Sequence, residues 1–512
     1  MFTLKAEMVR KLPPLAWGAQ ISRRGTVSLV CGSSVYATKE GFTEGAWSDD
    51  FSIEGFRHAK AVVGSGGYIV GDSVVFRSST HTLERMWFVP TQELVFASNS
   101  LPFVLALSGT FLDDSYPHYE ADFLSFILGK KMRRSLQLAG GKKLLQLADS
   151  TVRVELSLKV EAAENRYAAD FSRFEEYREA LESLSLAITR NASASSRART
   201  YTPLASVSRG YDSPACATIA RRCGASRAIT FPDARAGFML SNDNGSDVGY
   251  MLELDVIVLD RTAYRIGNGD YEALFLASGG GGEDVVLSAA DEILPESIFF
   301  TGFLGDTLWG VQTDWRRSHR GRITYPGGGS IGEYRLNRDF VHLPLPILHL
   351  KSHRSVQRIS CSEAMKPWRL GIEYDRPIPR RIAEEAGVRR DAFGIQKMAV
   401  TVPMYYETAV TQVLGEAAEE SFKEFAKEKF PLLDIPKMRR RLRLYAATNW
   451  IRERITWRIS KMLYVRGLLS AIEPSLADRG RRSISESLLL VHWAVERLRS
   501  RYSDAILTHL AR

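Results

Sequence analysis

The sequence predicts an α/β protein with a β-rich beginning, a central parallel sheet and a helical, basic end. Up to about residue 160, short runs alternate apolar and polar residues and are broken by glycine, which is typical of half-buried strands. From there to about residue 400, short apolar runs alternate with helical segments, as in parallel α/β sheets. After Tyr405 the pattern is helical and rich in basic residues. We therefore expect three domains, at residues 1–165, 166–404 and 405–512.

The first domain is predicted to consist mainly of strands. Its clearest runs are TVSLVCGSSVYA (26–37), GGYIVGDSVVFRS (66–78) and TVRVELSLKV (151–160). Successive side chains of a strand point to opposite faces of the sheet, so alternation of this kind gives each strand one apolar face. We expect a β-rich fold up to a boundary near residue 165.

A helix is predicted to follow that boundary. From Phe171 onward, apolar residues recur at spacings of three and four, which is the stripe of an amphipathic helix: Phe174, Tyr177, Leu181, Leu184 and Ile188. The central domain then continues with apolar runs and helical segments in turn: PLASVS (203–208), SPACATIARRCG (213–224), RAITFP (227–232), SDVGYMLEL (246–254) and DVIVLD (255–260). Short buried strands joined by helices predict a parallel sheet built of right-handed crossovers.

The composition indicates a folded chain without a membrane span. Of 512 residues, 45% are hydrophobic and 25% charged, which excludes a disordered or fibrous protein. The longest uncharged stretch, Leu94–Leu112, contains several serines, an asparagine and a proline, so we expect no transmembrane helix. Charged residues interrupt the first eleven positions, so we expect no secretory signal and a cytoplasmic location.

Charge and cysteine content exclude some functions and leave others open. Lys and Arg number 68 against 59 Asp and Glu, and a net charge of +9 is too small for us to expect a nucleic-acid partner. Four cysteines form neither a disulfide framework nor a zinc knuckle. The basic surplus gathers at 437–467, where Trp450 and Trp457 stand among arginines. Such a segment can lie on acidic lipid or nucleic acid, but we expect it to pack on the central domain.

The segment ASVSRGYDSPACATIARRCG (205–224) is the first that carries chemistry. An apolar run ends at Ser208, a turn with Gly210 follows, and Asp212 and Ser213 open a helix. The free N–H groups of such a turn, together with its hydroxyls, can cradle an anion such as pyrophosphate. Asp212 can then hold a magnesium ion against that anion. The alternative is an ordinary strand-to-helix turn in which Asp212 or Ser213 caps the helix.

A second segment, FFTGFLGDTLWG (299–310), repeats this arrangement. An apolar run again precedes a turn with glycines, an aspartate and the start of a helix. Asp306 can supply the second carboxylate of a magnesium–triphosphate site, because one aspartate rarely holds a hard octahedral ion alone. The alternative is again a capped helix.

These motifs resemble those of the asparagine synthetase family, which includes β-lactam synthetase and the lasso-peptide cyclases. The residues from Ser208 to Ser213, SRGYDS, are similar to the family's SGGxDS pyrophosphate loop, and TGFLGDT (301–307) is similar to its SGxGGDE loop. The resemblance covers residues 170–400 and extends faintly to the first domain, where WFVPTQELVFASNSLPF (87–103) resembles late strands of a glutamine amidotransferase domain.

The resemblance implies an ATP-pyrophosphatase domain, of the adenine nucleotide α-hydrolase kind, preceded by a degenerate class II glutamine amidotransferase domain. It implies an ATP-dependent ligase in which a carboxylate attacks the α-phosphate, pyrophosphate leaves, and a nitrogen nucleophile displaces AMP to form an amide. ATP and Mg²⁺ are then required. In that family the pyrophosphate loop binds the phosphates, which assigns this role to five residues: Ser208, Arg209, Gly210, Asp212 and Ser213. Asp212 and Asp306 would hold the magnesium.

The resemblance also implies a catalytic lysine near the end of the synthetase domain. Lys397, in RRDAFGIQKMAV, follows a helical stretch as the family's lysine does and would stabilise the acyl-transfer transition state. The alternative is a solvated surface lysine. Glu333 lies about thirty residues beyond Asp306, which is similar to the position of the second catalytic acid in β-lactam synthetase. It is our candidate for the general base that activates the amine; the alternative is a surface or ion-paired carboxylate.

Three departures from the family pattern shape the expected function. Phe2 stands where the glutaminase cysteine would be, so we expect no glutaminase activity. Arg209 replaces a loop glycine and can add a phosphate contact. Phe303 stands where the family has a glutamate or a catalytic tyrosine. The alternative function is therefore a catalytically degenerate nucleotide-binding scaffold or partner protein.

The substrates are defined only by class. We expect a carboxylate, which can be a small metabolite, a peptide or a sugar acid, and an amine or ammonia as the nucleophile. The sequence is compatible with a homo-oligomer.

Overall fold

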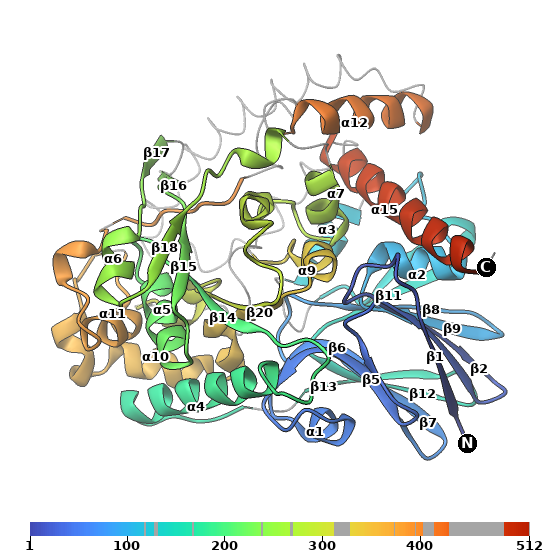
Figure 1. Ribbon diagram of the computed structural model, residues 1–512, viewed down its shortest axis with the longest axis horizontal. Coiled ribbons are helices and arrows are strands. Elements are labelled where there is room, and N and C mark those ends of the chain that lie inside the picture. Colours follow the sequence, from blue (N-terminus) through green and yellow to red (C-terminus); the bar gives the residue numbers. More distant parts are fainter. Residues whose placement is uncertain are drawn as a thin grey trace, which may run out of the picture.

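The computed structural model describes residues 1–116, 119–126, 132–165, 168–236, 239–266, 270–311, 328–372, 374–394, 396–402, 414–429 and 486–510. A β-rich part and an α/β part lie side by side, and the chain passes from the first to the second after residue 164 (Figure 1). The α/β class, the β-rich beginning and the helical end predicted from the sequence are confirmed. The basic segment 437–467, with Trp450 and Trp457, lies outside the described residues.

The β-rich part contains two sheets. One has seven strands in the order β1 (Thr3–Met8), β3 (Thr26–Cys31), β2 (Trp17–Ser22), β9 (Leu94–Ser98), β8 (Met86–Pro90), β11 (Lys143–Leu147) and β10 (Ser135–Gln137). The other has six in the order β13 (Val160–Glu164), β12 (Ser150–Glu155), β7 (Ser73–Arg77), β6 (Val62–Val70), β5 (Gly41–Trp47) and β4 (Tyr36–Ala37). Neighbouring strands are antiparallel, whereas β1 pairs with β3 in parallel.

The two sheets share one apolar core. Trp17 of the first sheet contacts Phe42 and Phe76 of the second, with ring centroids 5.0 and 5.9 Å apart. Phe88 of β8 packs edge-on against Phe76 at 5.4 Å. Phe2 is also buried in this core. The alternating pattern of the sequence therefore placed one face of each strand between two sheets.

The α/β part is built on a parallel sheet of five strands. Their order is β18 (Asp255–Val258), β15 (Arg227–Thr230), β14 (Thr202–Ser206), β19 (Ser297–Thr301) and β20 (Val341–Pro344). Every neighbouring pair is parallel. An antiparallel hairpin, β16 (Asp233–Ala236) and β17 (Met239–Asn242), follows β15 before the chain enters α6 (Ser246–Met251).

Helices cover both faces of this sheet, which is why its strands read as continuous apolar runs. Ala205 and Phe300 face one layer, formed by α4 (Phe174–Ala192), α5 (Asp212–Arg222), α8 (Gly305–Trp309), α10 (His353–Cys361) and α11 (Pro377–Glu384). Leu204 and Phe299 face the other, formed by α7 (Asp270–Ala277), α9 (Gly332–Arg338), α12 (Glu416–Lys429) and α15 (Glu486–Leu510). All five residues of the predicted amphipathic stripe are buried on α4.

Shorter elements complete the described chain. They are α1 (Ile53–His58), α2 (Leu101–Ser108), α3 (Tyr119–Leu124) and the 3₁₀ helices η2 (Ala139–Gly141), η3 (Ala263–Ile266), η4 (Val285–Ala290), η5 (Leu345–Ser352), η6 (Glu363–Trp368) and η7 (Arg390–Ala392). Among the described residues, we find no helix whose length and apolar character suit a bilayer.

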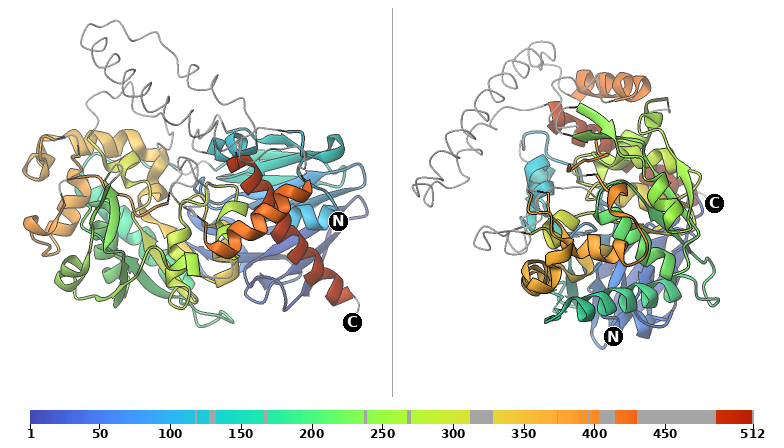
Figure 2. Two further views of the ribbon diagram at one scale, coloured as in Figure 1. Left: turned by 90° about the horizontal axis from the view of Figure 1, so that it is seen from above. Right: turned by 90° about the vertical axis from the view of Figure 1, so that its left-hand side faces the viewer.

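The last described helix joins the two parts. α15 packs on α2 of the β-rich part and on α7 of the α/β part, and Figure 2 shows it crossing from one to the other. Tyr502 of α15 stacks on Phe103 of α2, with centroids 4.6 Å apart. Arg497 and Arg501 of α15 bind Asp270 at the start of α7.

Candidate functional site

The two turns singled out in the sequence meet at one edge of the parallel sheet. β14 and β19 are adjacent and parallel, with Ala205 opposite Phe300, so their carboxyl ends lie together. The turn after β14 leads into α5, and the turn after β19 leads into α8. In open α/β sheets this edge is where ligands bind.

Close packing of the two turns requires glycine. A Cβ atom on Gly305 would lie 2.4 Å from the carboxyl carbon of Asp212, and one on Gly302 would lie 2.8 Å from the Asp212 carbonyl carbon. Between them, Leu304 adopts a left-handed backbone with φ of +64°. A leucine pays a steric cost for that conformation, and such strained residues gather at functional sites.

The first turn presents hydroxyl and backbone groups to one another. The Ser208 and Ser213 hydroxyls lie 2.7 Å apart, and the Gly210 N–H donates to Ser208 Oγ at 3.1 Å. Tyr211, rather than Asp212 or Ser213, stands at the N-cap position of α5. The Asp212 carboxylate is therefore free of the capping role that was the alternative explanation for it.

Asp212 is paired on one oxygen and unpaired on the other. Arg376, at the start of α11, donates to Oδ2, whereas Oδ1 is buried and has no hydrogen-bond partner in the described part of the chain. Burial raises the pKa of Asp212, and the nearby Arg376 and Lys397 oppose that rise. A buried, unpaired carboxylate oxygen is a group that needs a ligand or a water.

Aromatic rings fix the position of Arg376. Its guanidinium lies over the Tyr374 ring at 4.6 Å, and Tyr374 stacks on Tyr211 of the first turn with centroids 4.6 Å apart. Arg376 is itself buried. We did not identify it from the sequence, because it lies 164 residues from Asp212 and belongs to no local motif.

Lys397, the candidate catalytic lysine, lies beside the second turn. Its ammonium lies 3.7 Å from Oδ2 of Asp306, and half of its side chain is exposed. Burial opposes ionisation of Asp306, yet Lys397 and Arg376 hold its pKa below the ordinary value. Backbone hydrogen bonds hold the chain on both sides of Lys397: the Gly394 N–H donates to the Arg209 carbonyl oxygen, and the Val402 N–H donates to the Glu283 carbonyl oxygen.

A third carboxylate, which the sequence analysis missed, adjoins the first turn. Asp243 follows the β16–β17 hairpin, and its Oδ1 accepts a hydrogen bond from the Arg209 N–H at 3.0 Å. Burial raises the pKa of Asp243 to about 6, and Lys397 and Arg209 act against that rise. Lys397 thus influences three carboxylates at this edge of the sheet: Asp212, Asp243 and Asp306.

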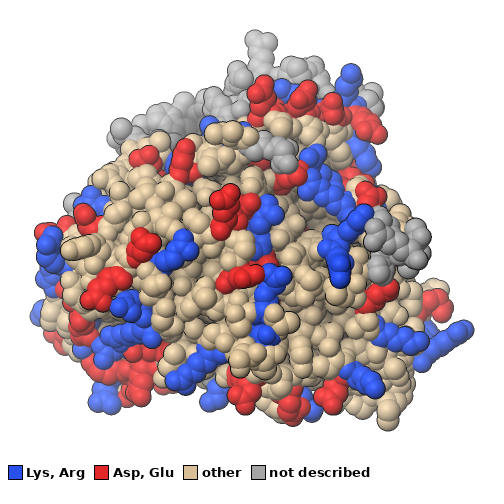
Figure 3. Space-filling model, viewed as in Figure 1, with Lys and Arg blue, Asp and Glu red and all other residues tan. Residues whose placement is uncertain are grey.

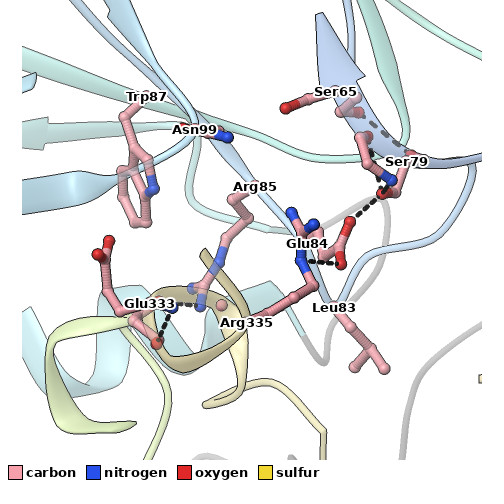
Figure 4. A pocket seen from close by; sticks show the side chains of 13 residues that line it. Ser65, Ser79, Leu83, Glu84, Arg85, Trp87, Asn99, Glu333 and Arg335 are labelled. Carbon is pink, nitrogen blue, oxygen red and sulfur yellow. Dashed lines mark hydrogen bonds and ion pairs between the residues drawn. The ribbon is translucent and has the colours of Figure 1, made fainter. Parts of the chain in front are cut away.

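Glu333 lies in a different place. It lines a cavity of about 20 Å³ between the β-rich part and α9 (Figure 4). Tyr502 of α15 donates to its Oε2 at 3.0 Å. Burial raises the pKa of Glu333 to about 7. The cavity is lined by Ser65, Ser79, Glu84, Arg85, Asn99 and Arg335, among others, and not by the two turns. This placement gives no support to a role for Glu333 as a base at the Asp212–Asp306 site.

The same cavity adjoins a buried ion-pair network that links the two parts. Arg335 of α9 binds Glu44 of β5 at 2.7 Å and Glu84 at 2.9 Å. Arg85 donates to the carbonyl oxygens of Ser278 and Gly279 beyond α7. Figure 4 shows Glu84 and Arg85 reaching the cavity from the β-rich part and Arg335 reaching it from α9. Since one or two water molecules would fill it, we interpret the cavity as a junction rather than a substrate site.

Asp212 and Asp306 fit a magnesium ion that shares its other ligands with a substrate. Among the described residues, no group of three or more His, Cys, Asp or Glu side chains is arranged to hold a metal by itself. Magnesium commonly takes one or two carboxylates together with waters and phosphate oxygens. The unpaired Oδ1 of Asp212 and the Asp306 side chain, which is 27% exposed, match that requirement.

The face of the described residues seen in Figure 3 carries no basic stripe. On the face seen in Figure 3, basic and acidic side chains are intermixed. A nucleic-acid surface would show a basic stripe there. Comparison of the whole chain with protein-family models found no match, and comparison with curated proteins found none either.

Proposed function

We propose that this chain is an ATP-dependent, AMP-forming carbon–nitrogen ligase that acts through an acyl-adenylate and has an ATP-pyrophosphatase fold resembling that of asparagine synthetase. One observation carries the proposal: two aspartates, each from a glycine-bearing turn after a parallel strand, lie at the same edge of the sheet, close enough for the charge of Asp306 to act on Asp212, and Lys397 lies beside Asp306. Bringing two carboxylates together costs free energy unless cations compensate them; Arg376 and Lys397 do so in part, and a bound Mg²⁺ would complete the compensation.

The first turn supports binding of the phosphates. The Ser208 and Ser213 hydroxyls and the Gly210 N–H point toward one another at the start of α5, where the helix dipole also favours an anion. Asp212 and Asp306 would hold Mg²⁺, which would neutralise charge on the phosphate oxygens. Arg376 keeps one oxygen of Asp212 occupied and so leaves Oδ1 to face the ligand.

Lys397 is suited to the second half of the reaction. When an amine attacks the acyl-adenylate, negative charge builds on the reacting carbonyl oxygen and on the departing phosphate. An ammonium held beside that point stabilises the transition state without further reorganisation. Lys397 supplies such a group, because its ammonium lies 3.7 Å from Asp306 and its neighbours Gly394 and Val402 are hydrogen-bonded to the carbonyl oxygens of Arg209 and Glu283.

The nitrogen donor is proposed to be an amine or free ammonia. Phe2, at the position of the family's glutaminase nucleophile, is buried in the core between the two sheets and offers no nucleophilic atom. The base that accepts the amine proton is unassigned, since Glu333 lies in another cavity.

A second candidate function is nucleotide binding without turnover. Phe303 favours it, because the second turn there carries a ring packed on His342, at 5.6 Å, instead of an acid or a phenol. Exchange of labelled pyrophosphate into ATP, driven by a panel of carboxylic acids, separates the two functions. A ligase shows acid-dependent exchange, and a scaffold binds Mg²⁺–ATP without exchange.

Asp306→Asn is the control for that assay. It removes one carboxylate and keeps the size of the side chain, so exchange that continues at the wild-type rate in the variant does not come from the Asp212–Asp306 site. If the protein neither binds Mg²⁺–ATP nor catalyses exchange, both functions are excluded.

A further inference from the structure

The phosphate loop of this chain is already occupied by one of its own carboxylates. The Arg209 N–H is one of the backbone donors of the turn between β14 and α5, and it points at Oδ1 of Asp243 at 3.0 Å. Asp243 is buried, and its carboxylate lies close enough to Lys397 and Arg209 to feel both charges. An anionic group therefore sits at the place where the loop would bind a phosphate.

The backbone around Asp243 holds that carboxylate in place. Asn244 forms a β-bridge with Ser208, and a Cβ atom on Gly245 would lie 2.6 Å from the Ser208 nitrogen. The Asp243 N–H donates to the Pro232 carbonyl at 2.7 Å. The segment that ends the β16–β17 hairpin is thus packed directly against the loop, and it can move only if the hairpin or the loop moves.

We infer that Asp243 determines the affinity of the loop for phosphate: in the free protein its carboxylate takes the Arg209 N–H, and a bound pyrophosphate or nucleotide must displace it. This inference rests on the proposed function, because it assumes that the loop binds the phosphates of ATP. No bond is made or broken; one hydrogen-bond acceptor replaces another. A negative charge left beside the phosphates would weaken their binding and favour release of pyrophosphate after adenylation.

A merely structural role for Asp243 predicts a different change in the affinity for phosphate. If Asp243 served only to hold the loop in its binding shape, weakening its hydrogen bond with the Arg209 N–H would lower the affinity for phosphate or leave that affinity unchanged. If it competes with phosphate, removing its charge raises the affinity. Asp243→Asn keeps an oxygen that can accept from the Arg209 N–H and removes only the charge, so the sign of the change decides between the two roles.

The experiment is calorimetric titration of the full-length protein with Mg²⁺–pyrophosphate and, separately, with Mg²⁺–ATP. We expect Asp243→Asn to bind both ligands about tenfold more tightly than the wild type, the effect of removing one screened like charge. Asp247→Asn, an exposed carboxylate on the first turn of α6, is the matched control and should bind as the wild type does. Asp243→Ser, which shortens the side chain, should also bind more tightly and replaces the asparagine variant if that one fails to fold.

A pH series supplies a second readout. Above pH about 6 Asp243 is ionised and opposes the ligand, and below that pH it is protonated. The association constant of Asp243→Asn divided by that of the wild type should fall toward one as the pH drops through 6. Protonation of the ligand affects both constants and therefore cancels in this ratio. Equal or weaker binding by Asp243→Asn at pH 8, with a wild type that binds, overturns this inference and leaves the proposed function intact. If neither wild type nor variant binds either ligand, the proposed function fails and the inference with it.

Discussion

At the scale of single residues, the site is defined by carboxylates whose charges are compensated unequally. Asp306 is stabilised in its charged form by Lys397 and Arg376, and Asp212 is only partly compensated because burial dominates. A cation between them would remove that imbalance, which is the physical reason for proposing Mg²⁺ there. Arg376 and Lys397 would then be free to act on phosphate and on the acyl group.

Lys397→Ala tests the catalytic role of the lysine. We expect ATP affinity to stay within a few-fold of the wild type and the rate of amide formation to fall by about 10²-fold or more, the scale seen when one preorganised charge-stabilising group is removed. Adenylation, measured by pyrophosphate exchange, should survive. Lys397→Arg keeps the positive charge and should recover part of the loss.

An alanine variant with wild-type amide formation would return Lys397 to the role of a surface lysine. Lys366→Ala is the matched control, because Lys366 is an exposed lysine on η6 with one surface ion pair.

Glu333→Gln tests how the buried carboxyl affects stability. Burial raises the folded-state pKa of Glu333 from 4.5 to about 7, so the folded protein binds a proton that the unfolded chain releases. The cost of ionising it is absent below pH 4.5, grows between 4.5 and 7, and is complete above 7. We expect the glutamine variant to gain up to about 3 kcal/mol in free energy of unfolding relative to the wild type above pH 7. Denaturant titrations at pH 5 and pH 8 measure this difference.

A stability difference between Glu333→Gln and the wild type that is the same at both pH values would show that Glu333 has an ordinary pKa in the folded protein. Glu292→Gln, at an exposed position in a turn of the α/β part, serves as a control and should show no pH-dependent difference.

At the scale of elements, α15 fastens the two parts of the molecule together. Trp493 and Leu498 of this helix belong to the core shared with α7 and α12, whereas Tyr502 packs on Phe103 of α2. The helix thus buries apolar side chains against both parts at once. Its loss would expose Glu333 and the cavity beside it, because Tyr502 covers that carboxyl.

Tyr502→Ala is expected to lower the free energy of unfolding by about 3 kcal/mol, because it removes a buried aromatic ring and leaves a cavity. Tyr502→Phe keeps the ring and removes only the hydroxyl that donates to Glu333, so it should lose much less. Denaturant unfolding followed by circular dichroism measures both variants. Equal stability of Tyr502→Ala and the wild type would mean that α15 is not docked as described.

At the scale of the whole molecule, the sequence predicted the layers of the fold better than the contacts of the site. The period-two runs and the stripe on α4 report burial, which is a local property, and both were confirmed. Asp212 and Asp306 lie in local turn motifs and were identified for that reason. Arg376 and Asp243 reach the first turn from α11 and from beyond the hairpin, so no local pattern reports them.

The structure places Glu333 in a cavity that the two turns do not line, and the reason is topological. A separation of about thirty residues from Asp306 says nothing about which face of the sheet a helix covers. α8, which carries Asp306, packs on the face that α5 covers, whereas α9, which carries Glu333, packs on the opposite face with α7. Only the three-dimensional arrangement separates the two carboxylates.

The β-rich part supports a prediction about the nitrogen donor. Because Phe2 is buried between two sheets and has no nucleophilic atom, the purified protein should release no glutamate from glutamine, with or without Mg²⁺–ATP. A coupled glutamate assay measures this. Glutamate release that increases in proportion to this protein and is unaffected by Phe2→Leu would reveal a glutaminase centre elsewhere in the chain.

The central claim is that Asp212 and Asp306 form one magnesium–nucleotide site, and calorimetric titration of Mg²⁺–ATP tests it most directly. Wild-type protein, Asp212→Asn, Asp306→Asn and the control Asp391→Asn, a surface carboxylate paired with Arg389, are compared at one pH. We expect at least tenfold weaker binding in each of the first two variants, which corresponds to at least about 1.4 kcal/mol, and no change in the control. Wild-type affinity in both Asp212→Asn and Asp306→Asn would contradict the claim.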